Sequence, residues 1–434
     1  MLTAFFRAFR TPDLRRKLLF TLAIMALYRF GAHIPLPGVD TRNLAACTGA
    51  SAHSNTNNQA FGLLNLFSGG ALLQLSIFAL GITPYITASI ILQLLTVVIP
   101  RLETLKKEGQ AGQAKITQYT RYLTICLSVL ESAVTLTAAR DNPGYLLGDR
   151  CRSVAVFYPR LTWEGMAVMV VIMTAATSLL MWLGELITQR GIGNGISLLI
   201  FASIASRIPS GIQAWWTNPD QVFVVMMPFI ALAVIVGIVF VQEGQRRIPV
   251  QYAKRVVGRR MTTGGSTYLP LRVNMAGVIP VIFAASIMAF PPTIGQLLNT
   301  PAALDFAAFF SPNGWAYVVG EVFFIIVFTY FYTAVTFNPV DQADNLKKYG
   351  GFIPGVRPGR PTAEYLDRIL SRLTFPGALY LGAVAALPTI LISQTSANFF
   401  FGGTSILIVV GVALDTMKQL EAQLMMRNYE GFLK

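Results

Sequence analysis

The sequence predicts an all-α integral membrane protein with ten transmembrane helices. Hydrophobic residues make up 54% of its 434 residues and charged residues only 12%, whereas soluble domains carry about 25% charged residues. Apolar stretches of roughly 20 residues, the length that crosses a bilayer, recur along the whole chain. The predicted spans are residues 18–37, 76–99, 119–138, 163–187, 195–212, 222–241, 275–297, 315–337, 373–392 and 404–424.

Basic residues predict how the chain is oriented in the membrane. Ten spans put both termini on one side. Of the 34 lysines and arginines, 27 fall on that side and six on the other, and loops rich in Lys and Arg stay in the cytoplasm. We therefore expect both termini in the cytoplasm. The basic N-terminal segment leads into an apolar run without a small-residue cleavage site, so we expect the first span to be retained.

Ten spans divide into an N-terminal half, residues 1–214, and a C-terminal half, residues 215–434. Five spans in each half make the halves enter the membrane from opposite faces, which is the inverted-repeat arrangement. The halves share no evident sequence identity, so this prediction depends on topology alone. The functional site of such a protein lies between the halves, near the middle of the membrane.

A broken apolar segment precedes the second span. Residues 61–67 are apolar, and Ser68, Gly69 and Gly70 interrupt them before the next apolar run begins. The piece is too short to cross a bilayer and too apolar to lie bare in water. Irregular backbone at membrane depth is tolerated where it lines a cavity inside the protein. We expect residues 61–74 to line such a cavity; a re-entrant helix that only packs is the alternative.

Two long basic loops lie on the predicted cytoplasmic side, at residues 242–274 and 338–372. Their charge fits orientation and attraction to anionic lipid. It also fits docking to ribosomal RNA phosphates or to an acidic protein surface. Turn-forming residues such as Pro249, Pro354 and Gly355 favour docking, because basic residues that only orient the chain in the membrane need no rigid turns. The candidate docking residues are Arg246, Arg247, Lys254, Arg255, Arg259, Arg260, Lys347, Lys348 and Arg357.

The sequence holds no sign of an enzyme. It has no Walker phosphate-binding motif and no set of cysteines and histidines with metal-ligand spacing, so we expect no catalytic site, metal or cofactor. A secondary transporter is the alternative class, and it needs ionisable groups at the membrane centre. Glu131, Glu185 and Glu321 are all expected near span ends, which disfavours a transporter. A structural scaffold would not need the broken segment.

Long strings throughout the chain resemble the SecY family of protein-conducting channels. Among them are FSGGAL, IFALGI-x-PYI-x-ASI, KKEG, QYTRY, MWLGE, RGIGNGIS, GQRRI, NMAGVIP, ADNLKK, RPG and FGGTS. The resemblance implies a central pore in the bacterial cell membrane that passes unfolded secretory polypeptides and releases membrane segments sideways through a lateral gate. It also implies the partners SecE, SecG, the SecA ATPase, the ribosome, preproteins with their signal peptides, and anionic lipids.

The resemblance further implies residue roles. Residues 61–74 correspond to the family's plug, with Phe61, Leu64, Asn65, Phe67, Ser68, Gly69 and Gly70. An apolar constriction excludes water and ions yet passes a chain of any sequence. The family's pore ring, which forms this constriction, corresponds to Ile82, Ile86, Ile200, Ile282 and Ile408. A single isoleucine in a membrane helix otherwise faces lipid or packs in the core.

In the family, spans 2 and 3 meet spans 7 and 8 at the lateral gate. Glu131 is expected to bond Thr87, Gln93 or a backbone group there, or else to reach solvent near a span end. The resemblance also implies that Arg357, in the RPG string, engages the motor and the ribosome. The residues implied for the gate are Thr87, Gln93, Glu131, Ser286 and Phe290.

Three cysteines occur in the chain. Cys126 lies within a predicted span and is expected to be an apolar filler. Cys47 and Cys151 lie in loops on the predicted outer side, which is oxidising in a bacterium. The sequence does not decide between a disulfide that joins them and two unpaired thiols, because a disulfide needs Cα atoms within about 7 Å of each other.

Overall fold

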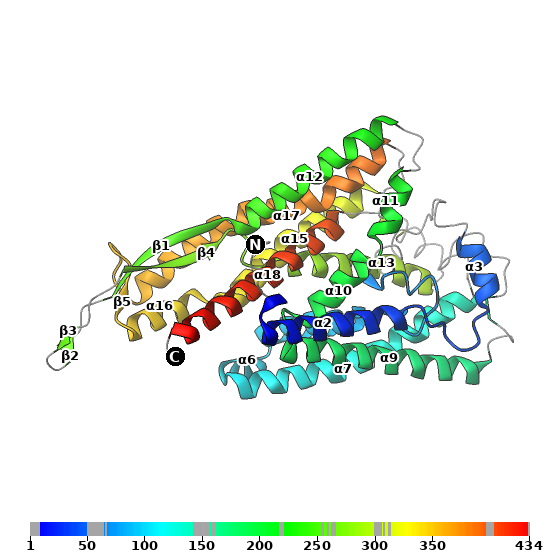
Figure 1. Cartoon of the computed structure of the whole chain (residues 1–434), viewed down its shortest axis with the longest axis horizontal. Coiled ribbons are helices and arrows are strands. Elements are labelled where there is room, and N and C mark those ends of the chain that lie inside the picture. The colour runs from blue at the N-terminus through cyan, green and yellow to red at the C-terminus, as the bar shows by residue number, and fades with distance from the viewer. Residues whose placement is uncertain are drawn as a thin grey trace.

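The structure, a computed structural model, describes residues 9–49, 65, 67–141, 151, 156–157, 162–216, 221–252, 256–257, 260–261, 266–298, 306, 309–310, 314–395 and 403–432. Long helices dominate it (Figure 1). In chain order the elements are α2 (Pro12–Gly31), α3 (Thr41–Gly49), α5 (Thr83–Val98), α6 (Pro100–Lys107), α7 (Gln110–Asp141), α9 (Trp163–Arg190), α10 (Gly195–Ala205), α11 (Ile208–Trp216), α12 (Gln221–Glu243), β1 (Gln245–Tyr252), β2 (Val256–Val257), β3 (Arg260–Met261), β4 (Ser266–Arg272), α13 (Ile279–Leu298), α15 (Trp315–Thr336), α16 (Pro339–Lys348), β5 (Gly351–Phe352), α17 (Arg360–Thr395) and α18 (Gly403–Phe432).

Two groups of helices run along the long axis of the molecule. In Figure 1, α2, α7 and α9 follow its lower edge, and α12, α15, α17 and α18 run obliquely above them. Within the groups, α7 packs against α5 and α9, and α15 packs against α13 and α17. Between the groups, α10 packs against α18 and α5 packs against α13. The first group comes from the part of the chain up to α10 and the second from α12 onward; the predicted boundary after residue 214 stays a prediction.

The start of α2 and the end of α18 lie at the same end of the molecule, which we call the terminal side. Lys17 Nζ donates to Gln423 Oε1 over 3.5 Å, and Leu14, Ile192 and Leu420 form a small apolar cluster nearby. The hairpin of β1 and β4 also projects from this end, whereas α3 lies at the opposite end (Figure 1).

Several helices are suited to crossing a membrane. Among the described residues, six helices are long and apolar enough, and a seventh span results if α5 and α6 count as one bent pair. The six lie in α7, α9, α10 with α11, α12, α15 with α16, and α17. The remaining predicted spans fall on α2, α13 and α18, which do not meet this test among the described residues. The helical class is therefore clear, and the count of ten stays a prediction.

The second span is shorter than predicted. Its helix begins at Thr83 and not at residue 76, because Gly81 adopts a positive φ of 57° and Pro84 lies in the first turn of the helix. The 16 residues of α5 span about 24 Å at 1.5 Å per residue. The chain then turns by 99° at Ile99 into α6. The predicted span, residues 76–99, is therefore irregular at its start and ends at a sharp bend.

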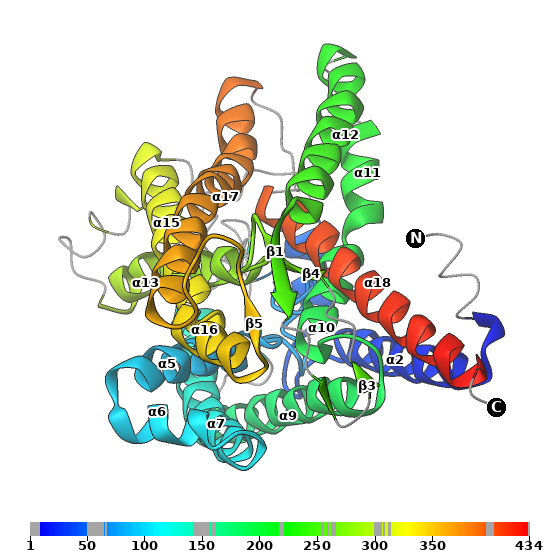
Figure 2. The ribbon, with the colours of Figure 1, turned by 90° about the vertical axis from the view of Figure 1, so that its left-hand side faces the viewer.

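The two basic loops fold into one compact unit. Strands β1 and β4 pair antiparallel, and β5 pairs with the other edge of β1. Ile248 and Val250 on β1 turn inward and pack against Ile353 and Leu366, the latter in the first turns of α17. Seen from the terminal side, this sheet and α16 lie toward the viewer (Figure 2). The small sheet is an addition to the predicted all-α fold.

A disulfide is present in this structure. Cys151 is buried and disulfide-bonded, and Cys126 is a free thiol. The side chain of Cys47 lies outside the described residues, so a bridge between Cys47 and Cys151 stays a prediction. Cys126 is exposed, so the expectation that it fills an apolar interior is wrong.

Candidate functional site

Five isoleucines from distant parts of the chain meet in one buried cluster. They are Ile86 on α5, Ile82 just before it, Ile200 on α10, Ile282 on α13 and Ile408 on α18. None of them is more than 5% exposed. We call these five residues the ring isoleucines, and the cluster that contains them the apolar cluster. It joins both groups of helices at the centre of the molecule.

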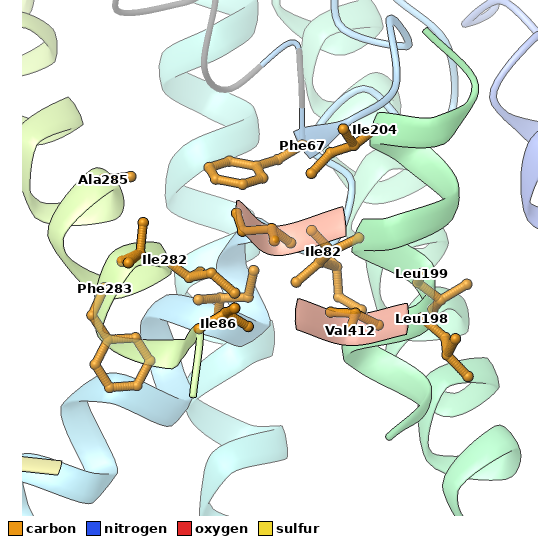
Figure 3. Packing of buried hydrophobic residues seen from close by; sticks show 14 of the residues in the cluster. Phe67, Ile82, Ile86, Leu198, Leu199, Ile204, Ile282, Phe283, Ala285 and Val412 are labelled. Atoms are coloured by element: carbon orange, nitrogen blue, oxygen red, sulfur yellow. The ribbon is translucent and has the colours of Figure 1, made fainter. Parts of the chain in front are cut away.

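The geometry of the ring isoleucines follows from helix spacing and close approach. Ile82 and Ile86 are four residues apart and lie on one face, below the ring of Phe67 in Figure 3. Ile282, on α13, lies to the left of Ile82 in the same view. A Cβ on Gly411 of α18 would lie 2.3 Å from Val278 Cγ1, so this glycine permits the close packing.

The turn that precedes α5 reaches into the apolar cluster. We call residues 67–70 the plug hinge. Phe67 is 3% exposed and belongs to the apolar cluster. Gly70 N donates to Asn65 O over 2.9 Å, and Leu72 N donates to Ser68 Oγ over 3.2 Å. Of the other predicted plug residues, Phe61 and Leu64 lie outside the described residues.

Side chains of α2 and of the α10 region hold the backbone of the plug hinge. Arg29 Nη1 donates to Gly69 O over 2.7 Å. Tyr28 Oη donates to Ser68 O over 3.4 Å and lies 2.6 Å from Ser203 Oγ. The guanidinium of Arg207 lies against Gly70, where a Cβ would be 2.8 Å from Nη2.

Both glycines of the plug hinge are required by this contact. Gly69 and Gly70 adopt positive φ angles of 65° and 93°, which other residues rarely adopt. A side chain at either position would also meet Arg29, Ser203 or Arg207. The hinge therefore has a single tight arrangement against α2 and α10 in this structure.

The predicted gate residues come from α5, α7 and α13, and the described side chains bond differently from expectation. Glu131 Oε2 accepts from Thr83 Oγ1 over 3.5 Å, so the expected bond of Glu131 with Thr87 or Gln93 is wrong. Thr87 Oγ1 donates back to Thr83 O, and Ser286 Oγ donates to Ile282 O. The Oε1 atom of Gln93 is buried without a partner. The side chain of Phe290 lies outside the described residues.

The other two acids of the predicted spans lie near the ends of their helices, as expected. Glu185 on α9 accepts two hydrogen bonds from Arg121 on α7, one of them 2.9 Å long from Nε. Glu321 lies in the second turn of α15 and is only 3% exposed. Neither carboxyl group simply reaches solvent at a span end. The carboxyl of Glu185 is fully engaged by a bidentate arginine, as in a structural ion pair.

A hydrogen bond of Lys106 joins the two helix groups. Lys106 on α6 donates to the backbone O of Val335, near the end of α15, over 3.1 Å. In Figure 2, α6 lies beside α16, which follows α15. The neighbouring Lys107 pairs with Glu103 over 2.7 Å, and its hydrogen bond with that carboxylate raises the pKa of the Lys107 ammonium. The bond of Lys106 with a helix C-terminus is also favoured by the helix dipole.

A cavity of about 480 Å³ lies on the terminal side of the apolar cluster, and we call it the vestibule. Val278 and Val412 belong both to its lining and to the apolar cluster. Its other walls come from α10, the end of α12, residues 272–279, the end of α15 and α18. The vestibule therefore borders the apolar cluster on the terminal side.

The described docking residues are exposed on or next to the unit formed by β1, β4, β5 and α16, which we call the loop unit. Arg246 and Arg247 lie on β1, Lys347 and Lys348 end α16, and Arg357 lies at a turn between Gly355 and Gly359. Both glycines have positive φ angles, 85° and 106°, so the turn is a defined one. The side chains of Lys254, Arg255, Arg259 and Arg260 lie outside the described residues. Among the described residues no group of three His, Cys, Asp or Glu side chains could hold a metal ion.

Comparison with known proteins gives the family. The sequence model of the SecY family matches residues 76–417. Over 450 residues the chain is 54% identical to the protein translocase subunit SecY of Streptomyces coelicolor and 53% identical to that of Mycobacterium tuberculosis, and each alignment covers 100% of both proteins. The chain belongs to the SecY family.

Solved structures agree with this SecY-family membership at the level of the fold. A structure described as a protein conducting channel has a TM-score of 0.61 at 17% identity and covers 94% of this chain and 91% of its own. A second structure, from work on the plug domain of the SecY protein, has the same TM-score at 19% identity. Sec61 from the canine ribosome–channel complex has a TM-score of 0.58. The predicted family is thus confirmed.

The sequence interpretation missed the contacts that hold the plug hinge. Arg29 carried the available signal, because an arginine within a span is rare and usually faces protein or water. Nothing in the sequence, however, connected Arg29 with Gly69, which lies 40 positions later. Thr83, the partner of Glu131, was likewise hidden by the misplaced start of the second span.

Proposed function

We propose that this chain forms a protein-conducting channel for unfolded secretory polypeptides. The observation that carries the proposal is the convergence of the five ring isoleucines, from helices in both groups, in one buried apolar cluster. In this role the ring isoleucines are the constriction, and Phe67 with the plug hinge closes it on the far side. Aliphatic side chains suit this task because they bind no particular sequence and offer no path to ions.

We further propose that residues 1–214 and 215–434 act as two halves that part at the contact of α5 with α13. Membrane segments would leave sideways there, with Thr83, Thr87, Gln93, Glu131, Ser286 and Phe290 at the gate. The bond of Lys106 with Val335 O supports this proposal, because it ties the two helix groups together. Such a bond breaks when the gate opens.

The loop unit of β1, β4, β5 and α16 is proposed to dock the partners that drive translocation. Its basic residues are exposed while its own apolar cluster keeps it rigid. SecA and the ribosome are the proposed docking partners, and two of the similar solved channels are described in ribosome complexes. The chain itself is proposed to be non-catalytic, with SecE and SecG beside it.

The proposed setting is the bacterial cell membrane, with both termini and the loop unit in the cytoplasm. Basic residues concentrated on the terminal side support this orientation. Anionic lipids would be attracted to the same basic side. Cys151 would then lie on the oxidising side, which suits its disulfide.

An import assay tests the proposed function. The chain is reconstituted into vesicles with SecE, SecG and SecA, and a secretory preprotein and ATP are added outside. We expect preprotein to become protected from added protease. Vesicles assembled without this chain serve as the control. Protection no greater than in those control vesicles would contradict the proposal.

A further inference from the structure

The wall of the vestibule contains two polar atoms without partners. Gln242 and Asn274 both line the cavity and are 8% and 5% exposed. The Nε2 atom of Gln242 and the Oδ1 atom of Asn274 are buried and make no hydrogen bond. Buried polar groups in folded proteins are nearly always bonded, so an unpaired donor and an unpaired acceptor in one cavity wall require an explanation.

The local structure fixes how these two amides are presented. Asn274 Nδ2 donates to Gly277 O over 2.9 Å, which identifies Oδ1 as the free atom of that amide. Gln242 lies against Gly411 of α18, where a Cβ would be 3.0 Å from Nε2. Any larger residue at position 411 would displace the Gln242 amide. One free hydrogen-bond donor and one free acceptor are thus held in place by neighbouring backbone.

The charges around the vestibule are paired with one another. Arg272 and Asp415 lie 3.9 Å apart, and Lys418 lies 2.9 Å from Glu243. The remaining polar lining is uncharged: Asn194, Ser197, Tyr332, Thr336, Thr416 and Gln419. Paired charges leave no excess to attract an anion such as a lipid headgroup, or a cation. The occupant that fits this lining is neutral and both accepts and donates hydrogen bonds.

We propose that Gln242 and Asn274 bind the main chain of the polypeptide as it passes through the vestibule. A peptide group offers a carbonyl oxygen to Gln242 Nε2 and an N–H to Asn274 Oδ1. Every residue except proline carries both groups, so the site is independent of sequence. This inference rests on the proposed function. It adds a main-chain binding site in front of the apolar constriction.

The site meets a physical need of the constriction. A main chain that enters an apolar ring loses the water bound to its peptide groups, which is unfavourable unless other partners replace that water. The amides of Gln242 and Asn274 supply such partners to the main chain before it enters the ring. Neutral amides also release the chain more readily than charged groups would, because hydrogen bonds to charged groups are stronger.

Import kinetics with single variants provide the first test. Gln242→Leu removes the free donor and keeps a similar volume. We expect the preprotein concentration at half-maximal import, KM, to rise about three- to tenfold, with normal assembly in the membrane. The matched control is Thr416→Val, since Thr416 lines the same cavity but its hydroxyl already donates to Val412 O over 2.7 Å. We expect its KM to be unchanged.

A substrate with one backbone ester provides the second test. Replacing a single peptide group by an ester, at the residue held in the vestibule by a stalled intermediate, removes the N–H that Asn274 would accept. We expect the ester to weaken retention of the stalled chain about threefold or more in the unmodified protein and to have no effect in Asn274→Leu. If Asn274→Leu fails to assemble, the Gln242→Leu result decides alone.

The outcomes separate this inference from the proposed function. Import by the unmodified protein with an unchanged KM in Gln242→Leu overturns the inference and leaves the channel intact, and a site filled by water alone gives this result. An equal rise in KM for Thr416→Val also overturns it, because any polar loss would then suffice. Failure of the unmodified protein to import preprotein contradicts the proposed function first.

Discussion

The two faces of the apolar cluster are bonded in opposite ways. On the plug face, Tyr28 and Arg29 donate to backbone carbonyls of the plug hinge, and glycines at positions 69 and 70 allow a tight fit. On the vestibule face, Gln242 and Asn274 each keep an unpaired polar atom. The backbone of the plug hinge is therefore held by hydrogen bonds within the protein, whereas two amides of the vestibule each keep an atom that can still form a hydrogen bond.

Because of this difference, one constriction can stay closed at rest and still admit a polypeptide. Closure depends on contacts that the protein makes with itself, at the plug hinge. Entry of a polypeptide depends on the amide atoms of the vestibule that have no partner in the resting protein. Variants on the two faces should consequently differ in kind: those on the plug face alter the resting barrier, and those on the vestibule face alter the handling of substrate.

The largest expected effect comes from placing a polar group between the two faces. Ile282→Asn or Ile408→Asn puts an amide into the apolar cluster and stabilises water there. A barrier lowered by about 3 kcal/mol, within the range for a buried amide, corresponds to roughly 100-fold more ion conductance. Planar bilayer recordings measure the resting conductance. We also expect looser selection of signal sequences, and unchanged conductance in both variants would refute a ring at these positions.

Arg357→Glu changes neither the plug hinge nor the vestibule. Reversing one exposed charge at the turn between Gly355 and Gly359 should repel an acidic docking surface. We expect SecA-driven import to fall by about tenfold or more, equivalent to a loss of about 1.4 kcal/mol. Assembly and resting conductance should stay normal, since the apolar cluster is untouched. Import at the normal rate would show that Arg357 has no docking role.

Arg29→Gln tests the plug face directly. It replaces a charged donor to Gly69 O by a neutral one, and a bond to a charged group is worth about 1.5–3 kcal/mol. We expect the open fraction of resting channels to rise about tenfold in single-channel recordings. Arg190→Gln is the matched control, because Arg190 lies exposed at the end of α9. Equal behaviour of the two variants would mean that Arg29 does not hold the hinge.

Lys106→Ala gives the smallest expected effect. The bond of Lys106 with Val335 O is exposed, and exposed contacts of this kind contribute about 0.2–1 kcal/mol. We expect sideways release of a model membrane segment to rise about twofold, measured as the fraction of segments in the lipid phase. Thr104→Ala on the same helix serves as the control. A decrease in release would indicate that Lys106 does not restrain the gate.

Much of the fold could be predicted because the spans are long and apolar, and the family could be predicted from exact strings. The grouping of the ring isoleucines depended on the family resemblance, since spacing relates Ile82 only to Ile86. The start of α5 was predicted too early because apolar content conceals a turn, although Gly81 and Pro84 were visible signals. Contacts between distant segments, such as Arg29 with Gly69 and Glu131 with Thr83, depend on tertiary packing and could not be predicted.

The loop unit illustrates the same limit. Alternating residues in β1, with Ile248 and Val250 turned inward, carry the period of a strand. The basic charge of the loop led to a prediction of docking, and the alternation was not interpreted as a strand. Its pairing with β5, about 100 residues later, joins two loops that the sequence presents as separate.

Site-specific crosslinking of a stalled secretory chain tests the constriction most directly. A photo-crosslinking amino acid is placed at Ile82 or at Ile282, and at Val236 of α12 as a control, because Val236 is 59% exposed. The preprotein is stalled halfway by a folded domain at its end. We expect adducts with the stalled chain at Ile82 and Ile282 and none at Val236. Absence of adducts at both ring positions, in vesicles that demonstrably hold the stalled chain, would contradict the proposed constriction.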